Sequence, residues 1–394
     1  MVPSQRAPEL YNDANSPSSY DFSSLTELEL HDLLEWPPEF SEISGGFTIQ
    51  RPPSRARNAM GTSLFESQIL SKRGITIVHS VKHIKTGTVW KHFRTSRPLP
   101  STAEEKDAYR SIPGLENINI WVSTHRDFLE MVEIEWASLL QYELNDSEHE
   151  VRAYDMLLKR EPRKPGISKT NKSSTERMIK FNMEPIHEEP WKAPPILPEE
   201  DKAESVELLC DIMPDCAYWV SVETFGREFE NQMSKIRDYV YVAQHRILCP
   251  YFSIEHKPNG EDALKEKHQI ATAAAIVLYN RYELRKCRLE KSGELWTERN
   301  TSVLRHYGLI ITRNEYSFWV IRARIAKDGV WQGCQMERLV RGCLARGGYL
   351  DMQDQIKIFA QWLNEVHRWG LTVHAPAVYE DIRVCVGTQH PLPK

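Results

Sequence analysis

The sequence predicts an α/β (α+β) fold, in which helices flank a mixed β-sheet core. Two observations carry this prediction. Short strand-like runs alternate with helical segments, and 41% of the 394 residues are hydrophobic, which is enough for a sizeable core. We expect residues 121–394 to form this domain, residues 61–120 to form an accessory segment, and residues 1–60 to form an acidic tail.

The tail differs from the rest of the chain in charge. Residues 1–50 contain nine acidic residues and one basic residue, whereas the whole chain has a net charge of −5. Residues 1–50 therefore carry −8 and residues 51–394 carry +3, which makes the body mildly basic. Residues 1–22 are rich in Ser, Pro, Asn and Asp, so we expect disorder there. Residues 24–36 could form a short leucine-rich helix, which either docks on a protein partner or stays solvated.

In the first half of the body, irregular sequence separates the predicted elements. Residues 75–78 (ITIV) are typical of a strand. Residues 126–159 have apolar residues at helical spacing, with an expected break near residue 145 and Asp146 or Ser147 as the cap of the second part. Residues 161–200 are rich in Pro and polar residues, so we predict no regular element there.

The second half of the chain alternates strands and helices, and Pro258-Asn259-Gly260 is a strong turn between two of them. We predict strands at 217–225 and 248–257, helical segments at 226–244 and 261–290, a hairpin at 307–325, and a closing helix at 351–369 that Gly370 ends.

The strand at 248–257 ends in an acid–x–lysine triplet, Glu255-His256-Lys257. Because side chains alternate along a strand, Ser253, Glu255 and Lys257 share one face. A carboxylate and an ammonium group on a buried strand are costly unless they pair with each other or bind a metal ion. The triplet therefore indicates either a structural ion pair or a metal-dependent site.

A second acid upstream could complete a magnesium site. Asp215 lies just before the strand predicted at 217–225 and forty residues before Glu255. Mg²⁺ needs only one or two carboxylates when water and phosphate oxygens supply the remaining ligands. Lys257 could then hold the attacking water or the scissile phosphate of a phosphodiester substrate. Glu223, within the predicted strand itself, is an alternative second ligand.

A basic cluster follows the helix predicted at 126–159. Six basic residues lie within 159–172, and its first four are Lys159, Arg160, Arg163 and Lys164. This density favours a phosphate-contacting loop or a nuclear-import signal, and a solvated loop is the plainer interpretation.

The helix predicted at 261–290 has a second basic group near its end. Small alanines in its middle let it approach the sheet closely, and Arg281 and Arg285 follow beside two tyrosines. Aromatic and cationic side chains together suit a nucleic-acid backbone. A core helix with a solvated basic end explains the same pattern.

Four of these features together resemble the PD-(D/E)xK nuclease superfamily: Pro214-Asp215, the run PYFSIEHK at 250–257, Gln269, and LYNRY at 278–282. The chain is similar in particular to uncharacterised fungal proteins with that nuclease-like domain, over roughly residues 125–385. The resemblance implies a restriction-endonuclease-like sheet core. In two respects the chain departs from the pattern, because Asp215 falls before its strand and the gap to Glu255 is long.

The resemblance also implies roles for individual residues. Asp215, Glu255 and Lys257 would be the catalytic trio, and Gln269 would support them from the helix. An upstream helical acid, Glu148 or Glu150, would be an additional metal ligand. The implied cofactor is Mg²⁺, with Mn²⁺ as a substitute, and the implied substrate is DNA or else RNA.

The expected protein is thus a metal-dependent nuclease, or a nuclease-fold protein without activity that binds nucleic acid or protein. Its seven cysteines are odd in number, scattered and without a CxxC pair, which argues against a disulfide framework and a zinc site. No run of 18 apolar residues and no apolar N-terminal run occurs, so we expect no membrane span and no classical secretory signal. We expect an intracellular protein of the nucleus or the cytoplasm.

Overall fold

The computed structural model describes parts of the unit that spans residues 53–394. The expectations for the tail at 1–60, for the helix at 24–36 and for the turn at 258–260 fall outside the described residues. The described residues are 61, 63–78, 88–93, 105–161, 175–183, 185, 190–197, 212–225, 227–257, 264–344 and 352–387.

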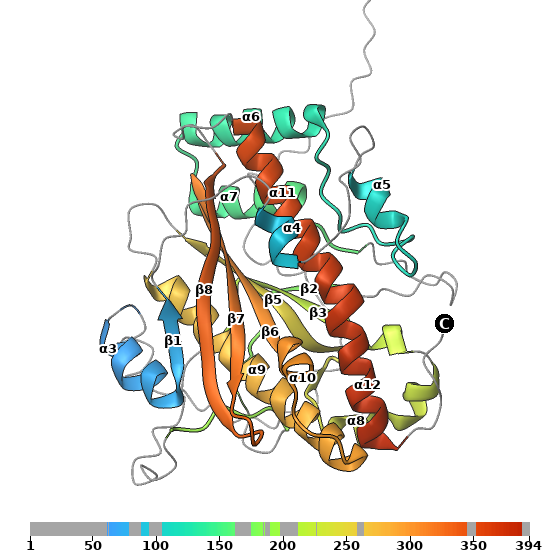
Figure 1. Ribbon diagram of the computed structural model, residues 1–394. Coiled ribbons are helices and arrows are strands. Elements are labelled where there is room, and N and C mark those ends of the chain that lie inside the picture. Colours follow the sequence, from blue (N-terminus) through green and yellow to red (C-terminus); the bar gives the residue numbers. More distant parts are fainter. Residues whose placement is uncertain are drawn as a thin grey trace, which may run out of the picture. The chain divides into compact units, whose positions relative to one another are not determined.

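An eight-stranded mixed sheet forms the centre of this unit (Figure 1). The strand order is β1-β8-β7-β6-β5-β3-β2, and β4 pairs with β5. The pairs β1–β8 and β5–β6 are parallel, and the others are antiparallel. The strands are β1 (Ile75–Val78), β2 (Thr175–Ile179), β3 (Cys216–Ser221), β4 (Val242–Ala243), β5 (Ile247–Lys257), β6 (Arg305–Thr312), β7 (Glu315–Ile325) and β8 (Trp331–Cys343).

Helices cover both faces of the sheet, so the predicted mixed α/β fold with flanking helices is confirmed (Figure 1). Helix α9 packs on one face, whereas α6, α11 and α12 lie over the other. The α-helices are α3 (Ser63–Phe65), α4 (Thr88–Phe93), α5 (Glu105–Arg110), α6 (Arg126–Gln141), α7 (Asp146–Arg152), α8 (Met233–Arg237), α9 (Leu264–Ser292), α10 (Glu298–Ser302), α11 (Met352–Trp369) and α12 (Ala375–Val386).

Strand β5 lies in the interior of the sheet, between β3 and β6 and under α9, as the sequence predicts. Its alternation places Phe252 and Ile254 in the core beneath α11 and α12. On the other face, the alanine-rich part of α9 comes very close to β6. A Cβ at Gly308 would lie 2.5 Å from Ile270 Cγ2, so only glycine permits this approach.

The predicted helix at 126–159 is confirmed with its break. Helix α6 ends at Gln141, and α7 begins at Asp146 after a short loop. The cap is Asn145 rather than Asp146 or Ser147, because its side chain accepts a hydrogen bond from the Glu148 N–H at 3.0 Å.

Three strands were not predicted, and one of them, the short β4, lies within the segment expected to be helical at 226–244. Strand β2 lies within 161–200, where we expected no regular element; its sequence TERMI is too polar to show a strand pattern, and pairing with β3 along the sheet edge forms it. Strand β8 pairs with β7 on one side and with β1 on the other. The segment 61–120 therefore contributes β1 to the same sheet.

Three predicted boundaries were wrong. Strand β3 ends at Ser221, and residues 222–225 form a 3₁₀ turn. The helical segment at 226–244 reduces to a 3₁₀ turn and the short helix α8. The helix at 351–369 does not close the chain, because a π-helical turn leads into α12. Gly370 is present because a Cβ there would lie 2.4 Å from the Tyr251 ring, and not because the helix ends.

Candidate active site

The register between β3 and β5 brings two acids of the predicted trio together. Cys216 pairs with Ile254, so the next position along places Asp215 opposite Glu255. Opposed residues of an antiparallel pair lie about 5 Å apart and project to the same face. The forty-residue gap between these acids is therefore closed by one strand pair.

Glu255 is a buried acid that forms no ion pair with a described residue, although the charge of the nearby Lys265 opposes the rise of its pKa. Its side chain is 2% exposed, and its Oε1 atom has no hydrogen-bond partner within the part of the chain that the structure describes. Burial, followed by the neighbouring Asp215 and Glu266 carboxylates, raises the pKa of Glu255 well above its usual range. A buried carboxylate with an open oxygen and acids around it is the chemistry of a cation site.

Asp215 connects this acid to helix α7. Its Oδ2 atom accepts a hydrogen bond from the backbone N–H of His256 at 2.7 Å. Burial raises the pKa of the Asp215 carboxyl, the His256 hydrogen bond opposes this, and the nearby Glu150 adds to it. Tyr154 donates both to Glu150 Oε1 at 2.7 Å and to the Asp215 carbonyl at 3.1 Å, and so fixes the end of α7 against β3.

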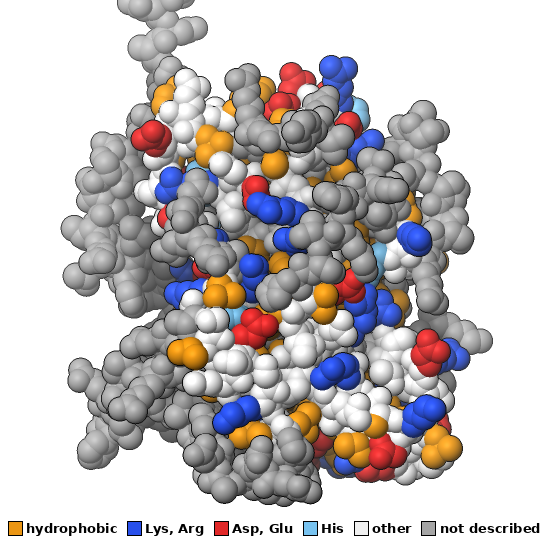
Figure 2. All heavy atoms as spheres, turned by 60° about the vertical axis from the view of Figure 1, so that its left-hand side comes forward, with side chains coloured by type: hydrophobic (Ala, Val, Ile, Leu, Met, Phe, Trp, Pro, Cys, Tyr) orange, Lys and Arg blue, Asp and Glu red, His pale blue; other side chains and the backbone are white. Residues whose placement is uncertain are grey.

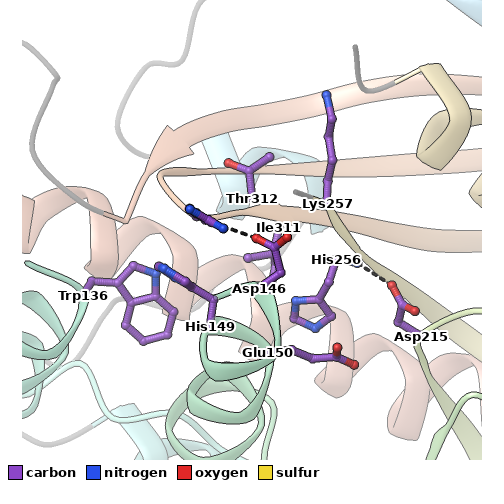
Figure 3. Close-up of a pocket in the computed structure, with 10 residues that line it drawn as sticks. Trp136, Asp146, His149, Glu150, Asp215, His256, Lys257, Ile311 and Thr312 are labelled. Carbon is purple, nitrogen blue, oxygen red and sulfur yellow. Dashed lines mark hydrogen bonds and ion pairs between the residues drawn. The ribbon is translucent and has the colours of Figure 1, made fainter. Parts of the chain in front are cut away.

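Lys257 is 7% exposed and lies beside Thr312 in the register of β5 and β6. No carboxylate among the described residues lies within the 4 Å of an ion pair with it. The structural ion pair between Glu255 and Lys257, one of the two interpretations of the triplet, is therefore not formed. In Figure 3 the Lys257 side chain leaves β5 in the opposite direction from His256, as strand alternation requires.

A shallow pocket adjoins these residues at the ends of β5 and β6 (Figure 3). It has a volume of about 190 Å³ and receives Glu150 from α7. Glu150 is thus the upstream acid near the site, whereas Glu148 is exposed. The residues that line the pocket are Trp136, Asp146, His149, Glu150, Asp215, His256, Lys257, Ile311, Thr312 and Arg313.

Comparison of the chain with protein-family models, with curated proteins and with solved structures gives no match. None of the described helices is both long enough and apolar enough to cross a membrane.

The acids fit a hard divalent cation such as Mg²⁺ only in part. In favour are the open Oε1 atom of Glu255 and the facing Asp215, since Mg²⁺ takes one or two carboxylates and completes its shell with water and phosphate oxygens. Among the described residues, however, no three His, Cys, Asp or Glu side chains already converge as a metal centre. A cation here would have to be held by two acids and by its other ligands.

Sequence reasoning missed Glu266. This residue lies in the first turn of α9, is buried, and is the second carboxylate that raises the pKa of Glu255. Gln269, the predicted supporting residue, lies three positions further on and is half-buried. The signal was available, because Glu266 shares the helical spacing of the sheet-facing Ile270 and Ala273.

Three predicted site residues are corrected. Glu223 is exposed, in the turn after β3. It lies at the other end of β3 from Asp215, about 20 Å away at 3.3 Å per residue, and cannot share a cation with it. Arg281 and Arg285 are buried and bind Asp381 at 2.9 and 3.0 Å, so they cannot contact a nucleic-acid backbone.

The predicted basic cluster is only partly described. Arg160 is exposed and Lys159 is half-buried, with its amino group 5.3 Å from the centre of the Phe128 ring. Arg163 and Lys164 lie outside the described residues. On the face drawn in Figure 2, coloured Lys and Arg side chains are interspersed with acidic and apolar ones.

Proposed function

We propose that the protein is a metal-dependent nuclease-like phosphodiesterase that acts on DNA or else RNA. The observation that carries the proposal is the burial of Glu255 opposite Asp215, with an open carboxylate oxygen and no ion pair to Lys257. Such an arrangement destabilises the metal-free protein. A protein that keeps it gains something else from it, and binding a cation is the chemistry these groups share.

The fold proposed for this function is restriction-endonuclease-like. In support, the elements follow the order that the resemblance implies: Asp215 beside β3, Glu255 and Lys257 on β5, helix α9 with Gln269, and then the β6–β7 hairpin. The parallel pairing of β5 and β6 places α9 between them as a crossover. This order brings the motif residues to one end of adjacent strands.

Each group would have a separate task in this chemistry. Asp215 and Glu255 would hold Mg²⁺ or Mn²⁺, with Glu150 close by as a further acid. Such an ion, when bound, polarises the phosphoryl oxygen and lowers the pKa of bound water. Lys257, which has no carboxylate partner among the described residues, would place its ammonium group beside the scissile phosphate and balance the charge that develops there. The buried surroundings strengthen that interaction.

A second function stays open, that of an inactive nuclease-fold protein that binds nucleic acid or protein. One specific observation favours it: the described acids do not already converge as a three-ligand metal centre. The two functions differ in whether a divalent cation binds at Glu255.

A cleavage assay with melting curves distinguishes them. The full chain is incubated with labelled duplex DNA, single-stranded DNA and RNA in Mg²⁺, Mn²⁺ or EDTA, alongside Glu255→Gln and Lys257→Ala. We expect each variant to lose about 100-fold or more of the cleavage rate while it remains folded. We also expect Mg²⁺ to raise the Tm of the wild type but not that of Glu255→Gln.

Glu223→Gln is the matched control, because it removes an acid from the other end of β3. It should cleave as the wild type does. A wild-type protein that folds but neither cleaves any substrate nor changes its Tm with Mg²⁺ or Mn²⁺ would contradict the nuclease proposal and leave the binding function.

A further inference from the structure

Two free thiols lie in contact between helices α9 and α12. The Sγ atoms of Cys287 on α9 and Cys385 on α12 are 3.1 Å apart, although 98 positions separate the two residues in the chain. The S–S bond of a disulfide is about 2.05 Å long. The two sulfur atoms therefore need to approach each other by only about 1 Å to form one.

Charged residues of the same two helices hold the thiols together. Arg285 of α9 binds Asp381 of α12 at 3.0 Å. Cys287 lies two residues after Arg285, and Cys385 lies one helical turn after Asp381. Lys291, one turn further along α9, donates a hydrogen bond to the Cys385 carbonyl. The two helices are thus joined before and after the thiols, which places the sulfur atoms next to each other before any bond forms.

A pair of thiols in contact serves either as metal ligands or as a site of oxidation. Zn–S bonds are about 2.3 Å long with tetrahedral angles, so two thiolates of one zinc ion lie about 3.8 Å apart. The sulfur atoms of Cys287 and Cys385 are closer than this. Within the described residues, no third His, Cys, Asp or Glu side chain completes a metal group with them. The geometry therefore suits oxidation better than metal binding.

The two thiols differ in their access to solvent. Cys287 is half-buried, whereas Cys385 is only 2% exposed. The Cys385 S–H group donates a hydrogen bond to the Cys287 sulfur, and such a bond favours negative charge on the acceptor. Because the thiolate is the nucleophile in thiol–disulfide exchange, Cys287 is the thiol that reacts first with a reagent from solvent.

Reaction at Cys287 prepares Cys385 for a second step. Burial raises the pKa of the Cys385 thiol, the hydrogen bond to Cys287 and the charge of Cys287 raise it further, and Lys291 lowers it. Once Cys287 is part of a mixed disulfide, its sulfur carries no charge. Its contribution to the pKa of Cys385 is then removed, so the Cys385 thiolate forms more readily beside the sulfur that it attacks.

We infer that Cys287 and Cys385 are a thiol-modification site, which reacts with a low-molecular-weight disulfide and closes to a reversible disulfide between α9 and α12. With oxidised glutathione, the Cys287 thiolate attacks one glutathione sulfur, the glutathione S–S bond breaks, and one glutathione thiolate leaves. Cys385 loses its proton to solvent and attacks the Cys287 sulfur, and the second glutathione thiolate leaves. Two protein thiols are oxidised to one disulfide, and one oxidised glutathione is reduced to two thiols.

Peptide mapping of the folded full chain tests the site. After treatment with oxidised glutathione and alkylation, we expect one linked pair of peptides, which contain Cys287 and Cys385 and which dithiothreitol separates. The same treatment in urea should link Cys287 to several of the other six among the seven cysteines, because unfolding removes the contact. Folded protein that yields only a glutathione adduct at Cys287, or no modification there, overturns the inference.

Three variants assign the roles of the two thiols. Cys385→Ser should stop at the glutathione adduct on Cys287. Cys287→Ser should give neither an adduct nor a link at Cys385, because that thiol is buried, and it serves as the test if Cys385→Ser does not fold. Cys343→Ser, at the other half-buried cysteine of the described residues, should still give the linked pair. A glutathione adduct on Cys385 in Cys287→Ser would overturn the order of attack.

Melting curves show whether the folded structure accommodates the bond. The crosslink closes a loop of 98 positions and so restricts the unfolded chain. The linked protein should therefore melt about 5 °C or more above the reduced protein. Oxidised glutathione should give no such rise in Cys385→Ser. A linked wild type that melts at or below the temperature of the reduced protein overturns the inference, since the bond would then not fit the native contact.

Discussion

Two groups of buried charged residues lie along helix α9, and they differ in the signs of the charges that they bring together. Near its first turn, Glu255 lies with Asp215 and Glu266, and these are acids together. In its second half, Arg281 and Arg285 share the Asp381 carboxylate of α12, at 2.9 and 3.0 Å. Both groups are in the interior, but Glu255 forms no ion pair with a described residue, whereas Asp381 forms two.

The difference separates a structural role from a functional one. Opposite charges in contact compensate each other, and so the arginine group holds α9 to α12. Like charges near one another raise one another's pKa and reduce stability, and the nearby Lys265 offsets this only in part, because the pKa of Glu255 stays well above its usual range. Removing a charge should therefore have opposite effects on stability in the two places.

The largest effect is expected at Asp381. Asp381→Ala leaves two buried guanidinium groups without their anion, and breaking a buried pair in this way costs about 3–5 kcal/mol. Urea denaturation of the full chain measures this loss. The control is Glu380→Ala, at the position before Asp381, which removes a more exposed ion pair with Arg383. It should lower the free energy of unfolding by less than about 1 kcal/mol. Equal stabilities of the two variants would refute a structural role for the arginine group.

At Glu255, removal of the charge is expected to increase stability, in contrast to Asp381. Each unit by which burial raises a pKa corresponds to about 1.4 kcal/mol at a pH where the unfolded chain is ionised. Glu255→Gln in EDTA at pH 7 should therefore increase the free energy of unfolding, because it removes a charge that burial disfavours. A variant that is less stable than the wild type would mean that the Glu255 charge has a stabilising partner, and the comparison between the two groups would fail.

The pH dependence of stability tests whether the raised pKa of Glu255 causes the stability gain of Glu255→Gln. The folded-state pKa of Glu255 is raised, so between the unfolded value, about 4.3, and the folded value only the folded state keeps the proton. The favourable state is thus present at low pH and is lost as the pH rises through the folded pKa. The stability difference between Glu255→Gln and wild type should grow by about 1.4 kcal/mol per pH unit above about pH 5 until it reaches that pKa.

Comparing the two proteins at each pH isolates Glu255. The buried His256, whose pKa is lowered to about 4, makes both proteins less stable as the pH falls, and this contribution cancels in the difference. A difference that stays constant from about pH 5 to about pH 8 would show that the gain has another origin.

The smallest effect concerns binding. Since Arg281 and Arg285 are buried, the proposed function assigns phosphate contacts to residues such as the half-buried Lys159 and the exposed Arg160. Changing these two to alanine should weaken nucleic-acid binding most at low salt and reduce the slope of log affinity against log salt by about 1–2. The double variant of the exposed Arg299 and Lys327 removes the same charge elsewhere and should keep the slope. Identical slopes for both double variants would assign the cluster to a solvated loop or an import signal.

Local sequence pattern was sufficient where one segment determines its own structure. The two-residue alternation of 248–257 predicted β5 and the shared face of Glu255 and Lys257. Helical spacing predicted α6, α7 and α9, and the strand-like pattern of 307–325 predicted the β6–β7 hairpin. These elements form because their own residues favour them and because each has a continuous apolar side to bury.

Tertiary structure decided everything that depends on a distant partner. Strand β2 forms because β3 offers it hydrogen bonds, although its polar sequence favours no strand. Arg281 and Arg285 look like solvated basic residues until α12, about a hundred residues later, places Asp381 against them. Whether a charge is solvated or buried depends on what covers it, and one segment does not contain that information.

The candidate site divides in the same way. The sequence predicted Asp215, Glu255 and Lys257 as site residues, because carboxylates and a lysine on or beside a buried strand have few structural roles. The sequence did not show that these residues lie close together, because this depends on the register that sets Asp215 opposite Glu255. The sequence determined the chemistry available to this protein, and only the pairing of strands, which closes a forty-residue loop, decided which groups share one space.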